Sequence, residues 1–256
     1  PGLLPAGRGG DSDAAMRGML ERAVGGDVVV LRISGGDGYN GYLFSQLGVP
    51  VDSVETIRVT SPAEAEDPEV LARVAGAEAL FIAGGDQTAY VEAWRGTPLA
   101  DAINALVNDK RAVVGGTSAG MMILGGTYYA PETLGVLSEE ALADPHHPFM
   151  ASLGHDDFLA IPRLADTVTD THFGDREREG RLMAFMARME TDRGVDAVAI
   201  ACDDFTAVVV DGDGRARVFG EWPAFPDEAF FLRSRCAPPA SQPETCVPGT
   251  PLTWDR

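Results

Sequence analysis

The sequence predicts a three-layer α/β fold, in which a mostly parallel sheet carries helices on both faces. Short apolar strands alternate with helices along the chain, which is the pattern of a parallel sheet covered on two sides. Glycine-rich turns follow several of these strands, as at the carboxyl edge of such sheets, where ligands bind. The 256 residues, 45% of them hydrophobic, are enough to bury a full core. We expect one hydrolytic domain over residues 1–235 and a tail over residues 236–256.

The first half of the chain contains several of the expected strands and helices in alternation. Val28–Ile33 is a short run that is apolar except for Arg32, and such runs are typical of a strand buried on both faces. Residues 62–77 are predicted to form a helix, because Ser61 is a good N-cap and proline and acidic residues follow it. Leu99–Asn108 is amphipathic and is also expected to be helical. The expected strands of this half run over residues 28–33, 54–59, 79–83 and 112–115.

The second half adds antiparallel strands to this pattern. A strand is expected over residues 167–173, a long helix from Asp175 to about Arg193, and a further strand over residues 197–202. Two apolar runs, residues 206–210 and 215–219, flank the segment Asp211-Gly-Asp-Gly214, which is a strong signal for a β-hairpin. The sheet is therefore expected to be mostly parallel, with antiparallel strands added late in the chain.

The charge balance excludes two classes of macromolecular partner. Lysine and arginine number 20 against 39 acidic residues, which gives a formal net charge of −19. A surface this acidic repels phosphate backbones, so we expect no nucleic-acid partner. It also lacks the basic amphipathic helices of membrane-surface proteins, and no apolar run approaches the roughly 20 residues that span a bilayer. We therefore expect no membrane partner.

No cofactor or metal ion is predicted. The segment Gly7-Arg-Gly-Gly10 lacks the spacing of a dinucleotide loop and has no Lys-Ser/Thr after it, so it does not indicate nucleotide binding. His146 and His147 lie near Asp144 in a segment with loop composition. Adjacent histidines in loops are more often solvated than bound to a metal, so we predict no metal site there.

The segment Gly116-Thr-Ser-Ala-Gly120 matches G-x-S-x-G and is the motif that carries chemistry. An apolar strand precedes it and small residues that can begin a helix follow it, which is the context of a nucleophile elbow. The elbow places the hydroxyl of Ser118 at the carboxyl edge of the sheet. The amide of Ala119 then points at a developing oxyanion. The alternative is a glycine turn that only packs a helix onto a sheet.

A serine nucleophile needs a base, and the chain has four histidines. His146, His147 and His155 lie in segments with loop composition. His172 stands at the end of the strand expected over residues 167–173, and this position at a strand end makes it the best candidate for a general base. The alternative is a structural histidine at the start of a helix.

Three separated motifs, in this order, make the chain resemble the cyanophycinase branch of the serine peptidases, which also include aspartyl dipeptidase. They are Phe81–Gln87, Gly116–Gly120 and Asp170–Phe173 with the arginines that follow. The resemblance extends from Leu80 to about Val210. It implies a class I glutamine-amidotransferase-like (flavodoxin-like) fold and a peptide substrate. Members hydrolyse bonds involving aspartyl residues, and cyanophycinases release β-aspartyl-arginine dipeptides from arginine-bearing poly-aspartate.

The resemblance assigns the catalytic residues one by one. Ser118 corresponds to the nucleophile and His172 to the general base. The family orients its histidine with an acid in a pattern like Asp-Glu-x-Thr-Ala, and residues 203–207 of this chain read Asp-Asp-Phe-Thr-Ala. Asp204 is therefore expected to orient the imidazole, with Asp203 as the alternative. Ala119 and Gly85, or the amide next to Gly85, correspond to the oxyanion donors.

The resemblance also assigns substrate-binding residues and shows one departure. The residues that correspond to the family's substrate-binding groups are Gln87, Asp170, Arg176, Arg178 and Arg181. The family motif often reads Asp-Gln-His-Phe, and Thr171 stands in place of the glutamine. Because the glutamine amide contacts substrate in cyanophycinases, this substitution is expected to shift specificity.

The arginines can also be interpreted without the family. In a helix that begins at Asp175, Arg176 lies in the first turn, and Arg178 and Arg181 share one face. Cations near a helix N-terminus oppose the helix dipole, so a bound carboxylate explains this placement better than folding does. The alternative is a solvated helix whose arginines pair with neighbouring acids.

Four other functions remain as alternatives. An aspartyl dipeptidase of the same family and a non-catalytic binding protein that keeps the fold both fit the motifs. An esterase of the α/β-hydrolase class is disfavoured, because its histidine follows the acid, whereas His172 precedes Asp204. A glutamine amidotransferase would place cysteine at the elbow, where this chain has Ser118.

The cysteines and the chain start give the only indications of compartment. Cys236 and Cys246 bracket a proline-rich stretch, and we predict a disulfide between them. A disulfide favours a secreted or periplasmic protein, as does a sequence that starts at Pro1 without an initiator methionine; otherwise a cytoplasmic address is expected. Cys202 lies in an apolar run and is expected to be a buried thiol. The resemblance further implies a possible homodimer.

Overall fold

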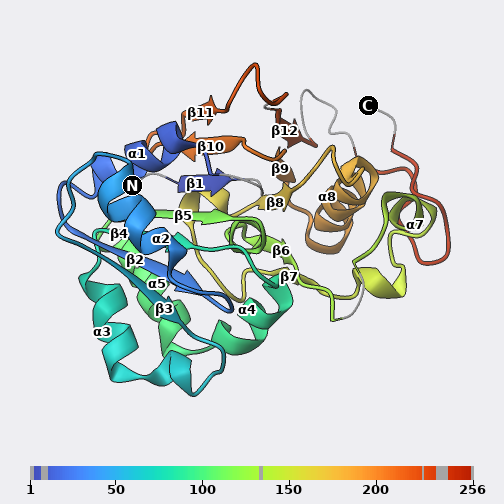
Figure 1. Cartoon of the computed structure of the whole chain (residues 1–256). Coiled ribbons are helices and arrows are strands. Elements are labelled where there is room, and N and C mark those ends of the chain that lie inside the picture. The colour runs from blue at the N-terminus through green and yellow to red at the C-terminus, as the bar shows by residue number, and fades with distance from the viewer. Residues whose placement is uncertain (1–2, 7–10, 133–134, 227, 235–241, 255–256) are drawn as a thin grey trace.

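The computed structural model describes residues 3–6, 11–132, 135–226, 228–234 and 242–254 of the chain (Figure 1). In this part of the chain the strands form two sheets. The larger has seven strands in the order β11-β10-β1-β5-β4-β2-β3. Its strands are β1 (Leu3–Ala6), β2 (Asp27–Arg32), β3 (Ser53–Arg58), β4 (Ala79–Ile82), β5 (Val113–Thr117), β10 (Ala207–Val210) and β11 (Ala216–Phe219).

The smaller sheet has five described strands in the order β12-β9-β8-β6-β7. Its strands are β6 (Thr127–Tyr129), β7 (Leu153–His155), β8 (Thr167–Thr171), β9 (Val198–Cys202) and β12 (Ala229–Arg233). The strands β6, β8 and β9 are parallel, and the two edge strands are antiparallel to their neighbours. The expected mostly parallel α/β architecture is confirmed, but the strands are divided between two sheets.

The helices cover the sheets from several sides. The α-helices are α1 (Asp13–Arg22), α2 (Gly38–Gly41), α3 (Pro68–Gly76), α4 (Gln87–Trp94), α5 (Pro98–Asn108), α6 (Ala119–Met122), α7 (Ser138–Ala143) and α8 (Glu179–Arg193). A π-helical turn spans Tyr42–Gln46, and 3-10 turns span Glu64–Glu66, Pro148–Met150 and Pro162–Leu164. Figure 1 shows α3, α4 and α5 on one side of the larger sheet and α1 and α2 on the other.

The strand β2 shows why this sheet is covered on both faces. Val29 and Leu31 pack into one buried cluster with residues of α4 and α5, whereas Val28 and Val30 pack into a second cluster with residues of α1. Successive side chains of a strand point to opposite faces, so an apolar run must be covered twice. The smaller sheet has its own core, in which Phe185 of α8 is fully buried.

A pair of glycines leads the chain from the larger sheet to the smaller one. Gly125 and Gly126 lie between α6 and β6. A Cβ on Gly125 would come within 2.5 Å of the carbonyl oxygen of Thr167, and one on Gly126 would overlap that of Ala165. The backbones approach this closely only because glycine has no side chain. The contact lies beside the pairing of Thr127 in β6 with Val168 in β8, where the chain enters the smaller sheet.

Two of the expected helices have different bounds. The helix expected over residues 62–77 is a 3-10 turn followed by α3, because Pro68 disfavours helical backbone at the residue before it. That residue, Asp67, is extended and its carboxylate instead caps α3 by accepting from the amide of Glu69 at 2.8 Å. The helix expected from Asp175 begins at Glu179 as α8, so Arg176 does not lie in its first turn.

Most predicted strands lie where the sequence indicated, and several other elements were not predicted. The strands β2, β3, β4, β5, β8 and β9 lie within one or two residues of their predicted positions, and β10 and β11 form the predicted hairpin. The helix expected after the elbow, α6, has only four residues. The sequence did not predict the elements β1, α1, α2, α4, β6, α7, β7 and β12.

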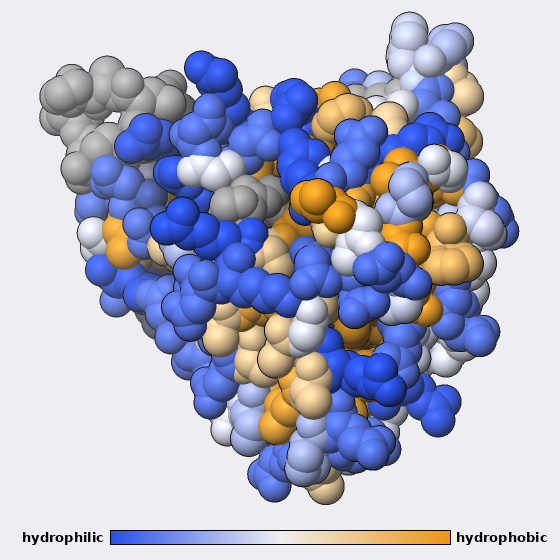
Figure 2. Space-filling view, turned by 90° about the vertical axis from the view of Figure 1, so that its left-hand side faces the viewer, coloured by the Kyte–Doolittle hydropathy of each residue, from blue (hydrophilic) through white to orange (hydrophobic). Residues whose placement is uncertain are grey.

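Figure 2 shows hydrophilic residues over most of the face that it draws. The described helices include none that is both long enough and apolar enough to cross a membrane.

Candidate active site

Ser118 lies in a sharp turn between the last residue of β5 and the first residue of α6. Its backbone has φ 51° and ψ −120°, a conformation that is strained for a residue with a side chain. The flanking glycines allow it: a Cβ on Gly116 would come within 2.5 Å of the carbonyl group of Gly120, and one on Gly120 would overlap the carbonyl of Ile82. This strand–turn–helix geometry is that of a nucleophile elbow.

His172 follows the last residue of β8 and faces the serine. Its Nε2 lies 3.1 Å from Ser118 Oγ, although 54 positions separate the two residues in the sequence. The backbone of His172 also has a positive φ, 51°. The turn that this conformation makes at the end of β8 directs the ring back toward the elbow. Ser118 and His172 are thus brought together by the two sheets.

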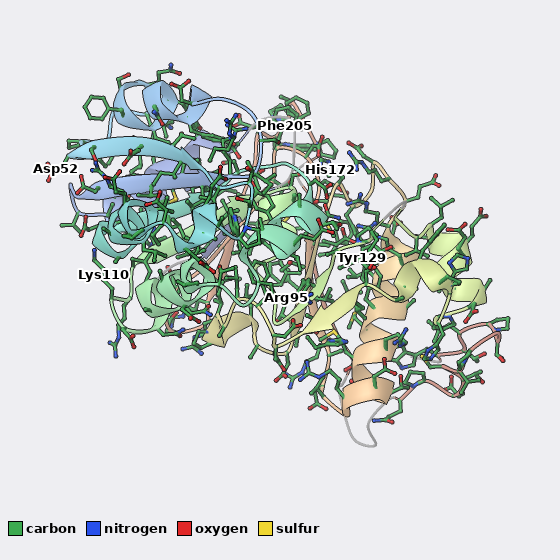
Figure 3. The ribbon with its side chains drawn as sticks, turned by 90° about the horizontal axis from the view of Figure 1, so that it is seen from below. Asp52, Arg95, Lys110, Tyr129, His172 and Phe205 are labelled. Carbon is green, nitrogen blue, oxygen red and sulfur yellow. The ribbon has the colours of Figure 1, made fainter. Side chains whose placement is uncertain are left out.

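Asp204 completes a chain of hydrogen bonds. The strands β8 and β9 are parallel neighbours with Thr171 opposite Cys202, so residues just after both strands lie side by side. His172 Nδ1 is 2.8 Å from Asp204 Oδ1. With the proton on Nδ1 donated to this carboxylate, Nε2 is free to accept the hydroxyl proton of Ser118. Figure 3 shows His172 close to Phe205, the residue that follows the acid.

The neighbouring acid, Asp203, has a different role. Its Oδ1 accepts a hydrogen bond of 2.6 Å from the amide of Gly174. Burial raises the pKa of this carboxyl. Of the two acids that the sequence left open, the structure places Asp204 against the imidazole, whereas Asp203 anchors the loop that follows His172.

The environment of His172 keeps its imidazole neutral. Its side chain is 5% exposed. Burial lowers the pKa of His172 below its ordinary value of about 6.5, and the positive charge of Arg176 lowers it further. Asp204 acts in the opposite direction, but the net shift is downward. A neutral ring is the form that accepts a proton from serine.

A cavity of about 630 Å³ opens beside these residues. It is lined by Asp11, Arg32, Tyr39, Gly84, Gly85, Gln87, Thr117, Ser118, Ala119, Met122, Thr171, His172, Arg176 and Arg178. Both expected oxyanion residues, Ala119 and Gly85, are on its wall. Gly84 also lies beside the serine, because a Cβ on Gly84 would contact Ser118 Cβ at 3.4 Å.

Three of the residues expected to bind substrate are engaged with one another. Arg181 binds the carboxylate of Asp170 through two hydrogen bonds of 2.8 and 2.5 Å. Arg178 Nη1 donates to the same carboxylate at 3.2 Å and to the carbonyl of Thr171 at 2.6 Å. The side chain of Asp170 is completely buried and does not line the cavity. This buried ion-pair network joins β8 to the start of α8, and Arg178 also lines the cavity.

Gln87, Thr171 and Arg176, the other residues expected to bind substrate, line the cavity as well. Gln87 is the first residue of α4, and Arg176 is exposed and forms no ion pair within the described part of the chain. Thr171 is fully buried, and its hydroxyl has no hydrogen-bond partner among the described residues. The position at which the family often has glutamine is therefore a small residue with an unused hydroxyl.

Sequence reasoning missed one end of the cavity, formed by Asp11, Arg32 and Tyr39. Tyr39 donates a hydrogen bond of 2.7 Å to Asp11. Burial raises the pKa of both groups. The glycine-rich turn after the strand of Arg32 was a signal for a ligand site, but nothing in the sequence indicated Asp11 or Tyr39.

The tail contributes nothing to this site within the described residues. Cys202 of β9 and Cys246 of the tail are both buried, and no disulfide joins them. Cys236 lies outside the described residues, so its disulfide with Cys246 stays a prediction. The expectation of a buried thiol at Cys202 is confirmed, and burial raises its pKa.

A serine, a histidine and an aspartate joined by hydrogen bonds at the carboxyl edge of an α/β sheet form the arrangement found in serine hydrolases. A family model described as Peptidase family S51 matches residues 40–218. This chain belongs to peptidase family S51. The resemblance inferred from the three motifs is thereby confirmed.

The curated relatives are named cyanophycinases. That of Synechococcus elongatus is 29% identical over 178 residues, which cover 70% of this chain and 49% of the relative. That of Trichormus variabilis is 26% identical over 179 residues, which cover 70% of this chain and 54% of the relative. The chain thus spans about half the length of the curated relatives it matches.

Two solved structures share the fold along nearly the whole chain. A peptidase from an acI-B1 Actinobacterium superposes with a TM-score of 0.62 at 16% identity, over 91% of this chain and 96% of that one. A putative peptidase E protein from Listeria monocytogenes superposes with a TM-score of 0.53 at 13% identity, over 86% of this chain and 98% of that one. At these identities the likeness shows the fold alone.

Proposed function

We propose that this chain is a serine-type exopeptidase that hydrolyses aspartyl-containing peptides through Ser118, His172 and Asp204. One observation carries the proposal: an unbroken chain of hydrogen bonds joins Ser118 Oγ to His172 Nε2 at 3.1 Å and His172 Nδ1 to Asp204 Oδ1 at 2.8 Å. A nucleophile within reach of a base, and a base oriented by a third group, form the minimal machinery for acyl transfer.

In the first half-reaction Ser118 Oγ attacks the carbonyl carbon of the scissile peptide bond. His172 Nε2 accepts the hydroxyl proton as the new C–O bond forms. The carbonyl oxygen becomes an oxyanion, which the amides of Ala119 and of Gly84 or Gly85 stabilise; one such donor contributes about 3 kcal/mol in related enzymes. The C–N bond then breaks, and the imidazolium returns its proton to the leaving amine.

The second half-reaction hydrolyses the acyl-enzyme. A water molecule takes the place of the leaving amine, loses a proton to His172 Nε2 and attacks the ester carbon. Collapse of the second oxyanion releases the acid product, and Ser118 regains its proton. Asp204 holds the ring in the required tautomer and stabilises the imidazolium in both halves.

The substrate we propose is cyanophycin, cut to β-aspartyl-arginine dipeptides. The names of the curated relatives support it. The formal net charge of −19 supports it as well, because an acidic surface attracts an arginine-bearing polymer. Thr171 argues for altered specificity within this class, since a buried threonine cannot reach as a glutamine amide does.

A serine-directed fluorophosphonate tests the nucleophile directly. We expect covalent labelling of the purified protein, with the mass increase mapped to Ser118, and no labelling of Ser118→Ala. The matched control is Ser45→Ala, because Ser45 is exposed and bonds only to the carbonyl of Gly41. Ser118→Ala should lower turnover by about 10⁶-fold. Absence of labelling in the wild type would overturn the proposal and favour a binding protein.

A substrate panel separates the alternatives within the family. Cyanophycin and a set of α- and β-aspartyl dipeptides are incubated with the protein, and products are identified by mass spectrometry. Release of β-aspartyl-arginine from the polymer supports the proposed substrate. Cleavage of dipeptides without cleavage of the polymer identifies an aspartyl dipeptidase instead.

A further inference from the structure

A glycine-rich turn holds one arginine of the catalytic cavity in place. Arg32, the last residue of β2, donates from Nε to the carbonyl of Ser34 and from Nη1 to the carbonyl of Gly36. Gly35 lies between these carbonyls with φ 90°, and a Cβ there would overlap the guanidinium. The turn therefore wraps around the side chain and requires glycine to do so. This is the turn after the first expected strand, to which the proposed reaction gives no role.

The topology brings this arginine to the nucleophile. The strands β2, β4 and β5 are adjacent and parallel, with Leu31 opposite Ile82 and Ile82 opposite Gly116. Their carboxyl ends meet at one edge of the sheet, where they deliver Arg32, the Gly84–Gly85 turn and Ser118. The contact is tight, since a Cβ on Gly85 would come within 2.8 Å of the side chain of Ile33.

Arg32 and Ser118 line the same cavity, which has a volume of about 630 Å³.

Charge distinguishes Arg32 from the other arginines around the cavity. Arg178 and Arg181 share the carboxylate of Asp170. Arg32 and Arg176 form no ion pair among the described residues, but Arg176 lies in an exposed irregular segment, whereas Arg32 is fixed by two carbonyls. Carbonyl oxygens orient a guanidinium without neutralising it. The guanidinium of Arg32 is thus held in one orientation, and no carboxylate of the described residues pairs with it.

The acid at this end of the cavity leaves that charge available. Asp11 accepts a hydrogen bond of 2.7 Å from Tyr39, and burial raises the pKa of its carboxyl. It forms no ion pair with Arg32 in the part of the chain that the structure describes.

We propose that Arg32 is a carboxylate receptor of this cavity and determines specificity for substrates with a carboxylate beside the scissile bond, as an aspartyl residue has. The proposal rests on the proposed peptidase function. Nε and Nη1 of Arg32 each donate to a carbonyl, whereas its Nη2 has no acceptor among the described residues and can donate to a carboxylate oxygen. The receptor lies on the wall formed by β2, apart from the arginines that follow His172.

Binding to a non-hydrolysing variant tests the receptor without turnover. Ser118→Ala is titrated by calorimetry with aspartyl-p-nitroanilide and asparaginyl-p-nitroanilide, which have the same shape and differ in one negative charge. We expect Ser118→Ala to prefer the aspartyl compound. Adding Arg32→Gln should weaken binding of the aspartyl compound by about 10- to 100-fold and leave the asparaginyl compound unchanged, because only a charge-assisted contact is lost.

Three further variants serve as controls for the effect of Arg32→Gln. Arg58→Gln is the matched control: Arg58 pairs with Arg32 in register on β3, is exposed and does not line the cavity, so it should change nothing. Arg32→Lys keeps the charge but loses the fork, and an intermediate loss is expected. Arg176→Gln tests the rival cation. Thermal melting of each variant shows whether the turn still folds.

The outcomes are distinct. Equal weakening of both compounds by Arg32→Gln, loss through Arg176→Gln instead, or failure of Ser118→Ala to bind the aspartyl compound would each overturn the receptor. If the fluorophosphonate does not label the wild type while the Arg32-dependent preference is present, the peptidase function fails and the carboxylate site stands.

Discussion

Replacing Asp170 by asparagine should destabilise the protein strongly. The side chain of Asp170 is 0% exposed, and its two cationic partners, Arg178 and Arg181, are 12% and 6% exposed. Asparagine keeps the shape but removes the negative charge, so two nearly buried guanidiniums lose their counter-charge. Removing one partner of a buried ion pair typically costs about 3–5 kcal/mol of unfolding free energy. For a chain of this size that corresponds to a fall in Tm of about 6–10 °C.

Urea denaturation followed by circular dichroism measures this loss. The matched control is Asp192→Asn, which removes the same charge from an i,i+4 pair with Arg188 on α8, where the two side chains are 31% and 17% exposed. Its cost should stay below about 1 kcal/mol, because solvent screens the pair. If Asp170→Asn loses less than the control and instead raises KM, the carboxylate binds substrate, and the assignment of Asp170 to a structural network is wrong.

Three further changes probe the catalytic residues. Because the pKa of His172 is below its ordinary value, the acid limb of kcat/KM should lie below about pH 6.5. Arg176→Gln removes a positive charge that disfavours the imidazolium, so this limb should move to higher pH in a pH–rate series. A move to lower pH would contradict the argument. Asp204→Asn should lower kcat by about 10⁴-fold at nearly unchanged KM in steady-state assays, and full activity would exclude Asp204 as the orienting acid. Gly120→Ala should abolish fluorophosphonate labelling of Ser118 and lower Tm, because the added methyl group overlaps the carbonyl of Ile82. Normal labelling would show that the backbone of the elbow can shift to accept the methyl group.

Much of the fold could be predicted because its signals are local. The run Val28–Ile33 is apolar on both sides of a strand, and β2 is buried between two cores. The hairpin of β10 and β11 was predicted from the turn Asp211–Gly214 and the two runs that flank it. The helix bounds were less predictable: α3 begins late because Pro68 forces Asp67 out of the helix. The chain enters the smaller sheet beside backbone contacts of Gly125 and Gly126 with segments about 40 positions downstream, which leave no local pattern.

The candidate nucleophile, base and acid were predictable for two different reasons. Ser118 was indicated by Gly116 and Gly120, because the backbone of the elbow packs so closely that these positions require glycine. His172 was indicated by its position at a strand end and by the family motif, whereas Asp204 was assigned through the family motif alone, with Asp203 left as the alternative. Choosing between two adjacent acids needs the direction of each side chain, which follows from the parallel pairing of β8 and β9.

The sequence by itself determined an α/β chain with a serine elbow, because strand burial and glycine turns are encoded within a few neighbouring residues. Only the tertiary structure decided which charged side chains form ion pairs and which do not. Asp170 pairs with both Arg178 and Arg181, whereas Arg32 donates to two backbone carbonyls and forms no ion pair in the part of the chain that the structure describes. The physical reason is that an ion pair depends on distance and burial, and both are set by contacts between segments that the sequence keeps far apart.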